Sequence, residues 1–160
     1  MREESEAVHA VEKYSDLIRR ICFLHLKNRN DTEDIAQSVF LKYILYQGTF
    51  ESDEHEKAWF IRVTVNTCKD WLKSLLRHPA VPLDVLSEEA LAVSDDHHEL
   101  LQTVLSLPSK YKDVIFLFYY EGYTAGEIAN ILGKKENTIY SLMSRGRALL
   151  KERLGGDGLE

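Results

Sequence analysis

The sequence predicts an all-α protein with two small helical domains joined by an acidic linker, the second domain containing a helix-turn-helix. Apolar residues recur with the period of a helix on both sides of a central stretch, and no segment alternates with the period of a strand. The central stretch holds six acidic residues and no basic one, and its prolines, Pro79 and Pro82, end the preceding helix. We therefore expect domains at 1–78 and 100–154, the linker at 79–99 and a tail at 155–160.

The composition is that of a globular protein and excludes several functional classes. No apolar run approaches the ~20 residues that span a bilayer, and the N-terminus is too acidic for a signal peptide, so we expect a cytoplasmic protein. Cys22 and Cys68 belong to no C-x-x-C or Cys/His cluster, which predicts two buried thiols. His97 and His98 predict a solvated loop, and neither a metal nor a cofactor is expected.

The net charge of −6 is distributed unevenly along the chain. Residues 79–99 carry −6, residues 1–78 carry −1, and residues 100–154 carry +3. A total charge is a poor guide to a binding surface when the charges are segregated. The acidic total therefore does not exclude a nucleic-acid interface in the basic second domain.

Helices are expected in the first domain at about 6–28, 32–47 and 55–77. Asp31 stands where it can cap the second helix, and the acidic residues after it favour the positive end of the helix dipole. The third helix has two distinct stripes. Its buried stripe consists of Ile61, Val65, Cys68, Leu72 and Leu75, and its basic stripe of Arg62, Asn66, Lys69, Lys73 and Arg77.

The basic stripe of helix 55–77 has two interpretations. Charged stripes are usually solvated helix faces, and the pattern alone favours that. The same stripe also fits a ridge that follows phosphates, with Asn66 able to hydrogen-bond a base edge. Trp59, Phe60 and Trp71 lie beside it, where aromatic rings either fill a core or stack on unpaired bases.

Four helices are expected in the second domain, at about 98–106, 109–121, 124–132 and 136–153. Pro108 separates the first two, with Ser109 as the next cap. Thr124 and Glu127 have the spacing of a capping box. Gly133 supplies the backbone conformation with which the chain leaves the third helix.

The last two of these helices, with the turn at Gly133, have the arrangement of a helix-turn-helix. The final helix is expected to bury Ile139, Leu142, Met143 and Leu150 and to expose Asn137, Tyr140, Ser141, Ser144, Arg145 and Arg147. The exposed groups form hydrogen bonds, and the arginines can reach phosphate or guanine. A plain αα-hairpin has the same pattern, but the basic charge of the segment favours DNA reading.

No catalytic constellation is recognisable in the sequence. Six residues separate Gly126 from Gly133, whereas a P-loop needs four, and no Ser or Thr follows the lysine. No Ser/His/Asp set or carboxylate pair is placed for catalysis. We therefore expect a protein that is not an enzyme and has no small-molecule substrate.

Three segments, in order along the chain, carry a family resemblance. DTEDIAQSVF at 31–40 is similar to the pattern D-x-E-D-x-x-Q-x-x-F, and AWFIRVTVNTCKDWL at 58–72 to W-[LF]-x-x-[IV]-x-x-N-x-x-x-D. LPSKY at 107–111, EIANILG at 127–133 and the pair after Asn137 are similar to L-P-x-x-[YQ], E-I-A-x-x-L-G and T-[VI]. Together, at matching spacing, they resemble the extracytoplasmic function (group 4) sigma factors of bacterial RNA polymerase.

The resemblance implies core RNA polymerase and promoter DNA as partners, and an anti-sigma factor as regulator. The first domain would bind core polymerase through Asp34, Gln37, Phe40 and Leu41. It would open the −10 promoter element through Arg62, Asn66, Lys69, Asp70 and Lys73. The second domain would read the −35 element as duplex through Tyr140, Ser141, Ser144, Arg145 and Arg147.

Two further assignments follow from the resemblance. The loop at 50–56 corresponds to the family's loop that captures a flipped base, and it is more acidic here. Leu117 and Phe118 either meet the flap of the second-largest polymerase subunit or only fill the core.

The final helix departs from the family pattern. Lys135 stands where relatives often carry a small capping residue, and Tyr140 and Leu142 stand where they often carry Lys or Arg. Because the helix is less basic than usual, we expect weak DNA binding by the protein alone and DNA recognition mainly within the holoenzyme.

Two alternatives stay open. A two-domain helix-turn-helix regulator would bind operators tightly without core polymerase, and its N-terminal half would be a receiver or a ligand pocket, which the helical pattern of 6–77 does not fit. An anti-sigma-binding protein without promoter function is the other. Asn66 and the exposed arginines argue mildly against it.

Overall fold

The computed structural model describes residues 2–26, 28–77 and 102–155, and every regular element in these ranges is a helix. The all-α class is therefore confirmed. The chain divides into an N-terminal and a C-terminal compact unit. The linker at 79–99, the histidine pair and most of the predicted tail lie outside the described residues. In the described ranges no helix combines the length and apolarity needed to cross a membrane.

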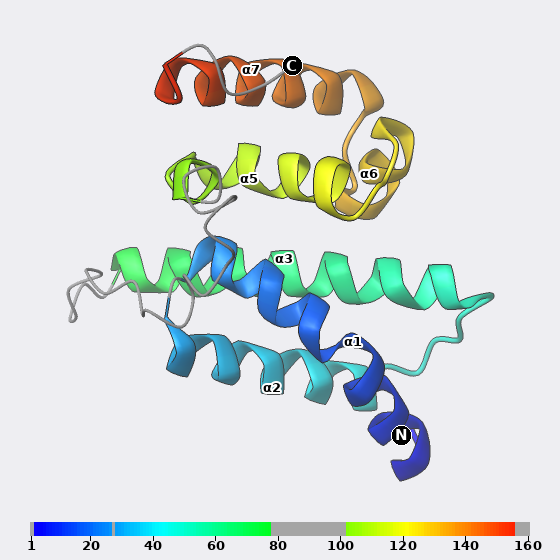
Figure 1. Cartoon of the computed structure of the whole chain (residues 1–160). Helices are drawn as coiled ribbons and strands as arrows, with labels where there is room; N and C mark the ends of the chain where they lie inside the picture. The colour runs from blue at the N-terminus through cyan, green and yellow to red at the C-terminus, as the bar shows by residue number, and fades with distance from the viewer. Residues whose placement is uncertain (1, 27, 78–101, 156–160) are drawn as a thin grey trace. The chain divides into compact units, whose positions relative to one another are not determined.

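The N-terminal unit is a bundle of three helices, α1 (Glu4–His25), α2 (Arg29–Leu45) and α3 (Asp53–Arg77). Figure 1 shows α2 and α3 running in opposite directions, joined by the loop at 46–52, and α1 packs against both. Arg19 of α1 pairs with Glu33 of α2 at 2.8 Å, which raises the pKa of Arg19 and lowers that of Glu33. At the other end the Arg2 backbone N–H donates to the Ile44 carbonyl at 3.1 Å, so α1 and α2 are antiparallel.

The core of this unit lies between the three helices. Of the stripe predicted for α3, Ile61, Val65 and Cys68 are at most 1% exposed, whereas Leu72 and Leu75 near the helix end are half-buried. Burying one such aliphatic side chain stabilises the fold by about 1.5–3 kcal/mol. Cys22 is also buried and its Sγ lies 3.9 Å from that of Cys68; both are free thiols, as predicted.

The cap of α2 differs from the expectation. The N-cap is Asn28, whose Oδ1 accepts from the backbone N–H groups of Asn30 at 2.8 Å and Asp31 at 3.2 Å. Asp31 lies in the first turn instead, where burial raises the pKa of its carboxyl. Asparagine caps as well as aspartate does, so the earlier residue begins the helix one turn sooner than predicted.

The C-terminal unit contains α5 (Ser109–Ile115), the π-helical turn η2 (Phe116–Tyr120), α6 (Ala125–Leu132) and α7 (Glu136–Arg153). Residues 102–105 are also helical and are part of the helix predicted at 98–106. Figure 1 shows α6 leading through a short turn into α7, and both α5 and α6 pack on α7. The α7 bounds are those predicted.

The helix predicted at 109–121 changes pitch at Phe116. The Glu121 N–H donates to the Phe116 carbonyl at 3.2 Å, five residues back, which is the bond of a π-turn. Phe116 and Leu117 are both buried, whereas Tyr119 and Tyr120 are exposed. The wider turn ends the run of buried residues that begins in α5, and the sequence pattern did not indicate this change of pitch.

The cap predicted at Ser109 is wrong. The N-cap position of α5 is held by Pro108, which has no side-chain hydrogen-bonding group. Its carbonyl accepts from the N–H groups of Tyr111 at 3.0 Å and Lys112 at 3.2 Å. Proline has a preset φ near the helical value, so the backbone itself starts this helix.

The helix-turn-helix of α6 and α7 confirms the prediction in its details. The Glu127 N–H donates to Thr124 Oγ1 at 3.1 Å, and the Thr124 N–H donates to Glu127 Oε1 at 2.9 Å, which lowers the pKa of Glu127. Gly133 ends α6 at φ 68°. In α7, a Cβ on Gly146 would lie 3.3 Å from the Ile115 side chain, so glycine lets α7 approach α5 closely.

Thr124→Ala is expected to lower the free energy of unfolding of the C-terminal unit by about 1 kcal/mol, because it removes the acceptor for the Glu127 amide. Both tryptophans of the chain, Trp59 and Trp71, belong to α3. In urea titrations at pH 7 the helical circular dichroism should therefore shift its transition while tryptophan fluorescence should not. Thr138→Ala, at an exposed site in α7, is the control and should leave both transitions in place.

Candidate nucleic-acid interfaces

One side of α3 presents the residues predicted for the −10 element. Arg62, Asn66, Asp70 and Lys73 are exposed and Lys69 is half-buried. Their spacing places them within one stripe, opposite the buried Ile61 and Val65. The structure therefore gathers these five side chains on one solvent-facing surface, with three cations and one amide along it.

The aromatic residues beside this stripe divide between core and surface. Phe60 is fully buried, with its ring centroid 4.6 Å from that of Tyr14 and 4.8 Å from that of Tyr43, so it is a core residue. Trp59 is half-buried and lies against the loop at 46–52, with ring centroids 5.2 Å from Tyr46 and 5.9 Å from Phe50. Trp59 thus links the loop to the start of α3.

Glu56, near the start of α3, was not among the predicted site residues. Its carboxylate accepts hydrogen bonds from the Tyr14 hydroxyl at 3.0 Å and the Tyr43 hydroxyl at 2.9 Å. Burial, reinforced by this carboxylate, raises the pKa of both tyrosines, which therefore stay neutral donors. Because Tyr14 belongs to α1 and Tyr43 to α2, one carboxylate joins all three helices where the loop ends.

The exposed face of α7 presents most of the residues predicted for the −35 element. Tyr140 is 56% exposed, and Ser141, Ser144 and Arg145 are exposed with it. Leu142 is buried, as predicted, so it takes no part in this surface. The face is polar but sparsely charged, which agrees with its sequence.

Arg147 is exposed as well and also contacts η2. Its Nε donates to the Tyr119 hydroxyl at 2.5 Å, and its guanidinium lies 5.4 Å from the Tyr119 ring centroid and 5.8 Å from that of Phe118. Residue 147 follows Tyr140 by about two helical turns, so the two lie side by side on the same face. Arg147 therefore belongs to the exposed face while its guanidinium is engaged with η2.

The exposed face of α2 contains the positions predicted to bind core polymerase. Asp34 and Gln37 are exposed, and Leu41 is 57% exposed. Phe40 is half-buried with its ring centroid 5.7 Å from that of Phe60, so it lies at the margin of this face. Leu45, 59% exposed, continues the face by one turn; its i+4 spacing from Leu41 is the signal that could have found it.

Leu117 is only 1% exposed, so it is part of the core and does not form a docking surface. Phe118 is half-buried and contacts Tyr119 and Arg147. The alternative of a core role is therefore the correct one for Leu117.

In the described ranges, no three His, Cys, Asp or Glu side chains gather where they could hold a metal ion.

The geometry defines a class of protein: a chain with a helical bundle that exposes a basic stripe, followed by a helix-turn-helix. A receiver domain contains a sheet, whereas the described part of the N-terminal unit has only helices. The alternative of an operator-binding regulator with a receiver therefore finds no support in the fold.

Residues 10–78 match the model of the family "Sigma-70 region 2", and residues 97–150 match "Sigma-70, region 4". The chain belongs to the sigma-70 family and is an extracytoplasmic function sigma factor, a factor that directs RNA polymerase to promoters. Sigma factors as a group are transcription initiation factors and not enzymes.

Similar proteins of known name span nearly the whole chain. The ECF RNA polymerase sigma factor SigW of Bacillus subtilis is 27% identical, over 90% of this chain and 86% of that protein. SigV of the same organism is 28% identical, over 88% and 86%. The fold resembles that of the sigma factor RpoE in complex with the anti-sigma factor NepR from Bartonella quintana, with a TM-score of 0.76 at 21% identity and coverage of 94% and 97%.

Glu56→Ala is expected to lower the free energy of unfolding of the N-terminal unit by about 1–3 kcal/mol, because two buried tyrosine hydroxyls lose their nearer acceptor and keep only contacts at 3.5 Å. Tryptophan fluorescence during urea unfolding should report the loss. Glu54→Ala removes an exposed carboxylate from the same helix turn and should change the midpoint little. Equal midpoints for the two variants would show that the tyrosine–carboxylate contacts are not important for stability.

Proposed function

We propose that the two units divide promoter recognition between them. The domain at 1–78 binds core RNA polymerase and opens the −10 element, and the domain at 100–154 binds the −35 element as duplex. The linker at 79–99 separates them, and 155–160 is a tail. The observation that carries the proposal is the presence, on one chain, of a region 2 bundle exposing Asn66 within a basic stripe and a region 4 helix-turn-helix.

The stripe on α3 suits a strand leaving the duplex. Arg62, Lys69 and Lys73 supply cations for successive phosphates, with displacement of counterions as the driving force. Asn66, exposed between them, offers one acceptor and two donors to a base edge. Trapping an unstacked base offsets the unpairing cost of a few kcal/mol.

The α7 surface suits positioning on duplex DNA. Arg145 can reach a phosphate or the acceptors of guanine, and Ser141 and Ser144 can donate to either. Because the face has few cations, its affinity for DNA is low without polymerase. We therefore infer that the holoenzyme holds α7 at the −35 element.

The partners follow from the same surfaces. The contact with core polymerase is formed by the exposed face of α2, through Asp34, Gln37 and Leu41, with Phe40 at its margin. Two solved structures with a similar fold are complexes, one with the anti-sigma factor NepR and the other with the cytosolic domain of CnrY. An anti-sigma factor is proposed for this chain as well. We also infer that the protein acts in the cytoplasm, where core polymerase is, and that it has no enzymatic activity of its own.

The core-binding surface is tested by Leu41→Ala. Truncating an anchor near the centre of an interface typically weakens binding by more than about tenfold, so competition binding to core polymerase should show at least that loss. Leu76→Ala is a matched control, because Leu76 is even more exposed, at 78%, but lies on α3. Equal affinities of the two variants would contradict the assignment of α2.

The promoter assignments are tested by transcription with core polymerase on a library of promoters with randomised −10 and −35 elements. Asn66→Ala should impair initiation with a change of preference only in the −10 element, and Arg145→Ala only in the −35 element; each loss should be about 5- to 100-fold, as for one base contact. Wild-type protein that forms no complex with core, or gives no promoter-dependent transcript, would refute the proposal. Initiation unaffected by either variant would refute the residues but not the function.

A further inference from the structure

Arg2, just before α1, makes contacts with several segments of the N-terminal unit. Its Nε donates to the Tyr43 carbonyl at 3.0 Å, its Nη2 to the Gly48 carbonyl at 2.8 Å, and its Nη1 pairs with Glu6 at 2.6 Å. Its side chain is only 11% exposed. An arginine that is this far buried, with all three nitrogens bonded, is a structural clamp and not a solvated charge.

The guanidinium also lies over aromatic rings from the same region. Its central carbon is 4.5 Å from the ring centroid of Tyr43, 5.0 Å from that of Phe50 and 5.9 Å from that of Tyr46. Cation–π contacts of this kind gain strength when the cation is desolvated. Arg2 therefore connects the end of α2 to the loop at 46–52 by both hydrogen bonds and ring contacts.

The loop at 46–52 has few other restraints on its backbone. Among the described residues, the bond from Arg2 to Gly48 is the one hydrogen bond made by the backbone of 47–50. A Cβ on Gly48 would lie 2.3 Å from the Tyr46 ring, so a larger residue there would have to displace that ring. The rest of the loop is held by ring packing, with Phe50 stacked against Tyr43 at 6.2 Å and tilted against Tyr46 at 5.6 Å.

Arg2 also lines the cavity that this loop borders. The cavity has a volume of about 340 Å³ and is lined by Arg2, Glu6, Thr49, Phe50, Ser52, Asp53 and Glu56. It lies between the loop, the start of α1 and the start of α3. The cavity's shape therefore depends on where Arg2 holds the loop, and with it Thr49 and the Phe50 ring.

We propose that Arg2 is a positioning residue for promoter opening: it holds the loop at 46–52 in the form in which the loop receives a base displaced from the −10 element. This inference rests on the proposed function, in which the N-terminal unit opens that element. Arg2 acts through the loop, and the loop's side chains meet the base. Losing the clamp should leave the bundle folded and core binding intact, because Leu41 and its neighbours lie on the exposed face of α2.

Lysine cannot replace this arginine. A single ammonium group on a flexible stem does not present the planar fork that bonds two carbonyls and a carboxylate at once, nor does it stack as a plane on aromatic rings. Arg2→Lys keeps the charge and the approximate size, so it separates the geometry of the clamp from its charge. Arg2→Ala removes both.

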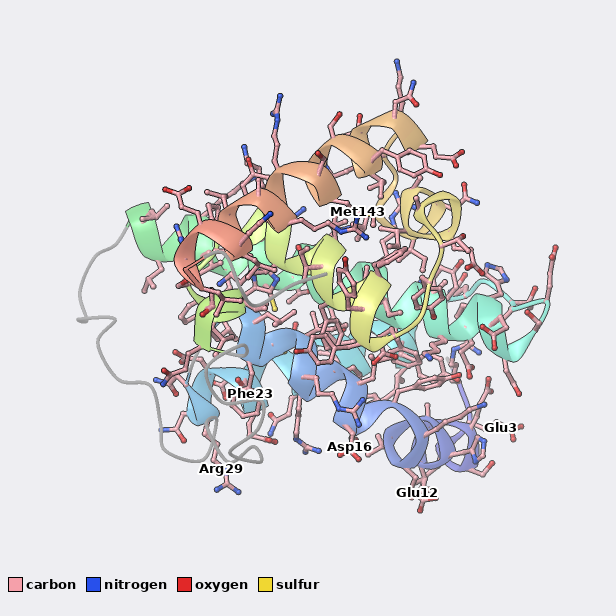
Figure 2. The ribbon with its side chains drawn as sticks, turned by 45° about the horizontal axis from the view of Figure 1, so that its top comes forward. Glu3, Glu12, Asp16, Phe23, Arg29 and Met143 are labelled. Carbon is pink, nitrogen blue, oxygen red and sulfur yellow. The ribbon has the colours of Figure 1, made fainter. Side chains whose placement is uncertain are left out.

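The first test measures the loop in the isolated protein and does not depend on promoter function. By NMR relaxation, the backbone order parameters of 47–50 should fall in Arg2→Ala from about 0.85, typical of rigid backbone, toward about 0.6, because the bond that holds the Gly48 carbonyl is lost. Arg2→Lys should also lie below wild type. The order parameters in the middle of α2 and α3 should stay as in wild type. The control is Glu12→Gln, whose side chain is on the outer side of α1 (Figure 2). Wild-type order parameters of the loop in both Arg2 variants would overturn the proposal.

The second test uses holoenzyme on the promoter library with a randomised −10 element. Arg2→Ala should bind core polymerase as wild type does, yet form open complexes at least about fivefold less often and with a flatter base preference at one position. On promoters with a pre-opened −10 region the rate should recover while the flattened preference remains. Unchanged base preference would refute the positioning role. If Arg2→Ala were unfolded, as judged by circular dichroism, Arg2→Lys would carry both measurements.

The two failures can be told apart. If wild-type protein shows no promoter-dependent transcription, the proposed function fails, whatever the order parameters of the loop are. If wild type transcribes and the Arg2 variants share its base preference, the proposed function stands and the inference about Arg2 is wrong.

Discussion

At the start of α3, Glu56 accepts hydrogen bonds from a tyrosine of α1 and a tyrosine of α2. One turn later, Phe60 packs its ring between those of the same two tyrosines. Together these contacts set the rotation of α3 about its own axis. Because successive residues of a helix turn by a constant angle, setting Phe60 inward also sets Asn66 and its basic neighbours outward. The exposed stripe is thus a consequence of the buried one.

The same cluster determines where the preceding loop can lie. Tyr43 contacts Glu56 through its hydroxyl, and its ring lies under Arg2 and beside Phe50. Loops carry binding residues most effectively when a rigid scaffold positions them. Here the scaffold is a set of aromatic rings held by one carboxylate and one guanidinium of opposite charge. The loop's backbone needs little hydrogen bonding of its own, because its neighbours place it.

In the C-terminal unit, backbone geometry sets the course of the chain through the helix-turn-helix. The capping box at Thr124 begins α6, and Gly133, in the left-handed conformation, forms the turn that follows. Gly146 has no side chain and lets α7 approach α5. The capping box and Gly133 have local sequence signals, which is why the helix-turn-helix was predicted accurately. The close approach at Gly146 and the bond from Arg147 to Tyr119, 28 residues earlier, are not local and were not predicted.

The sequence by itself determined the helical class, the buried positions Ile61, Val65 and Cys68 of α3, the buried thiols, the capping box and the buried face of α7. These features follow from the spacing of residues that are only a few positions apart within one helix or turn. The cap of α2 at Asn28 is local too, and it was missed because asparagine and aspartate cap helices about equally well. The tertiary structure alone decided that Leu117 is core. It alone decided that Glu56 joins three helices and that Arg2 reaches Gly48, 46 residues away. Such contacts depend on how the helices are placed against one another, and the spacing of residues within one helix does not predict which distant residue will lie beside it.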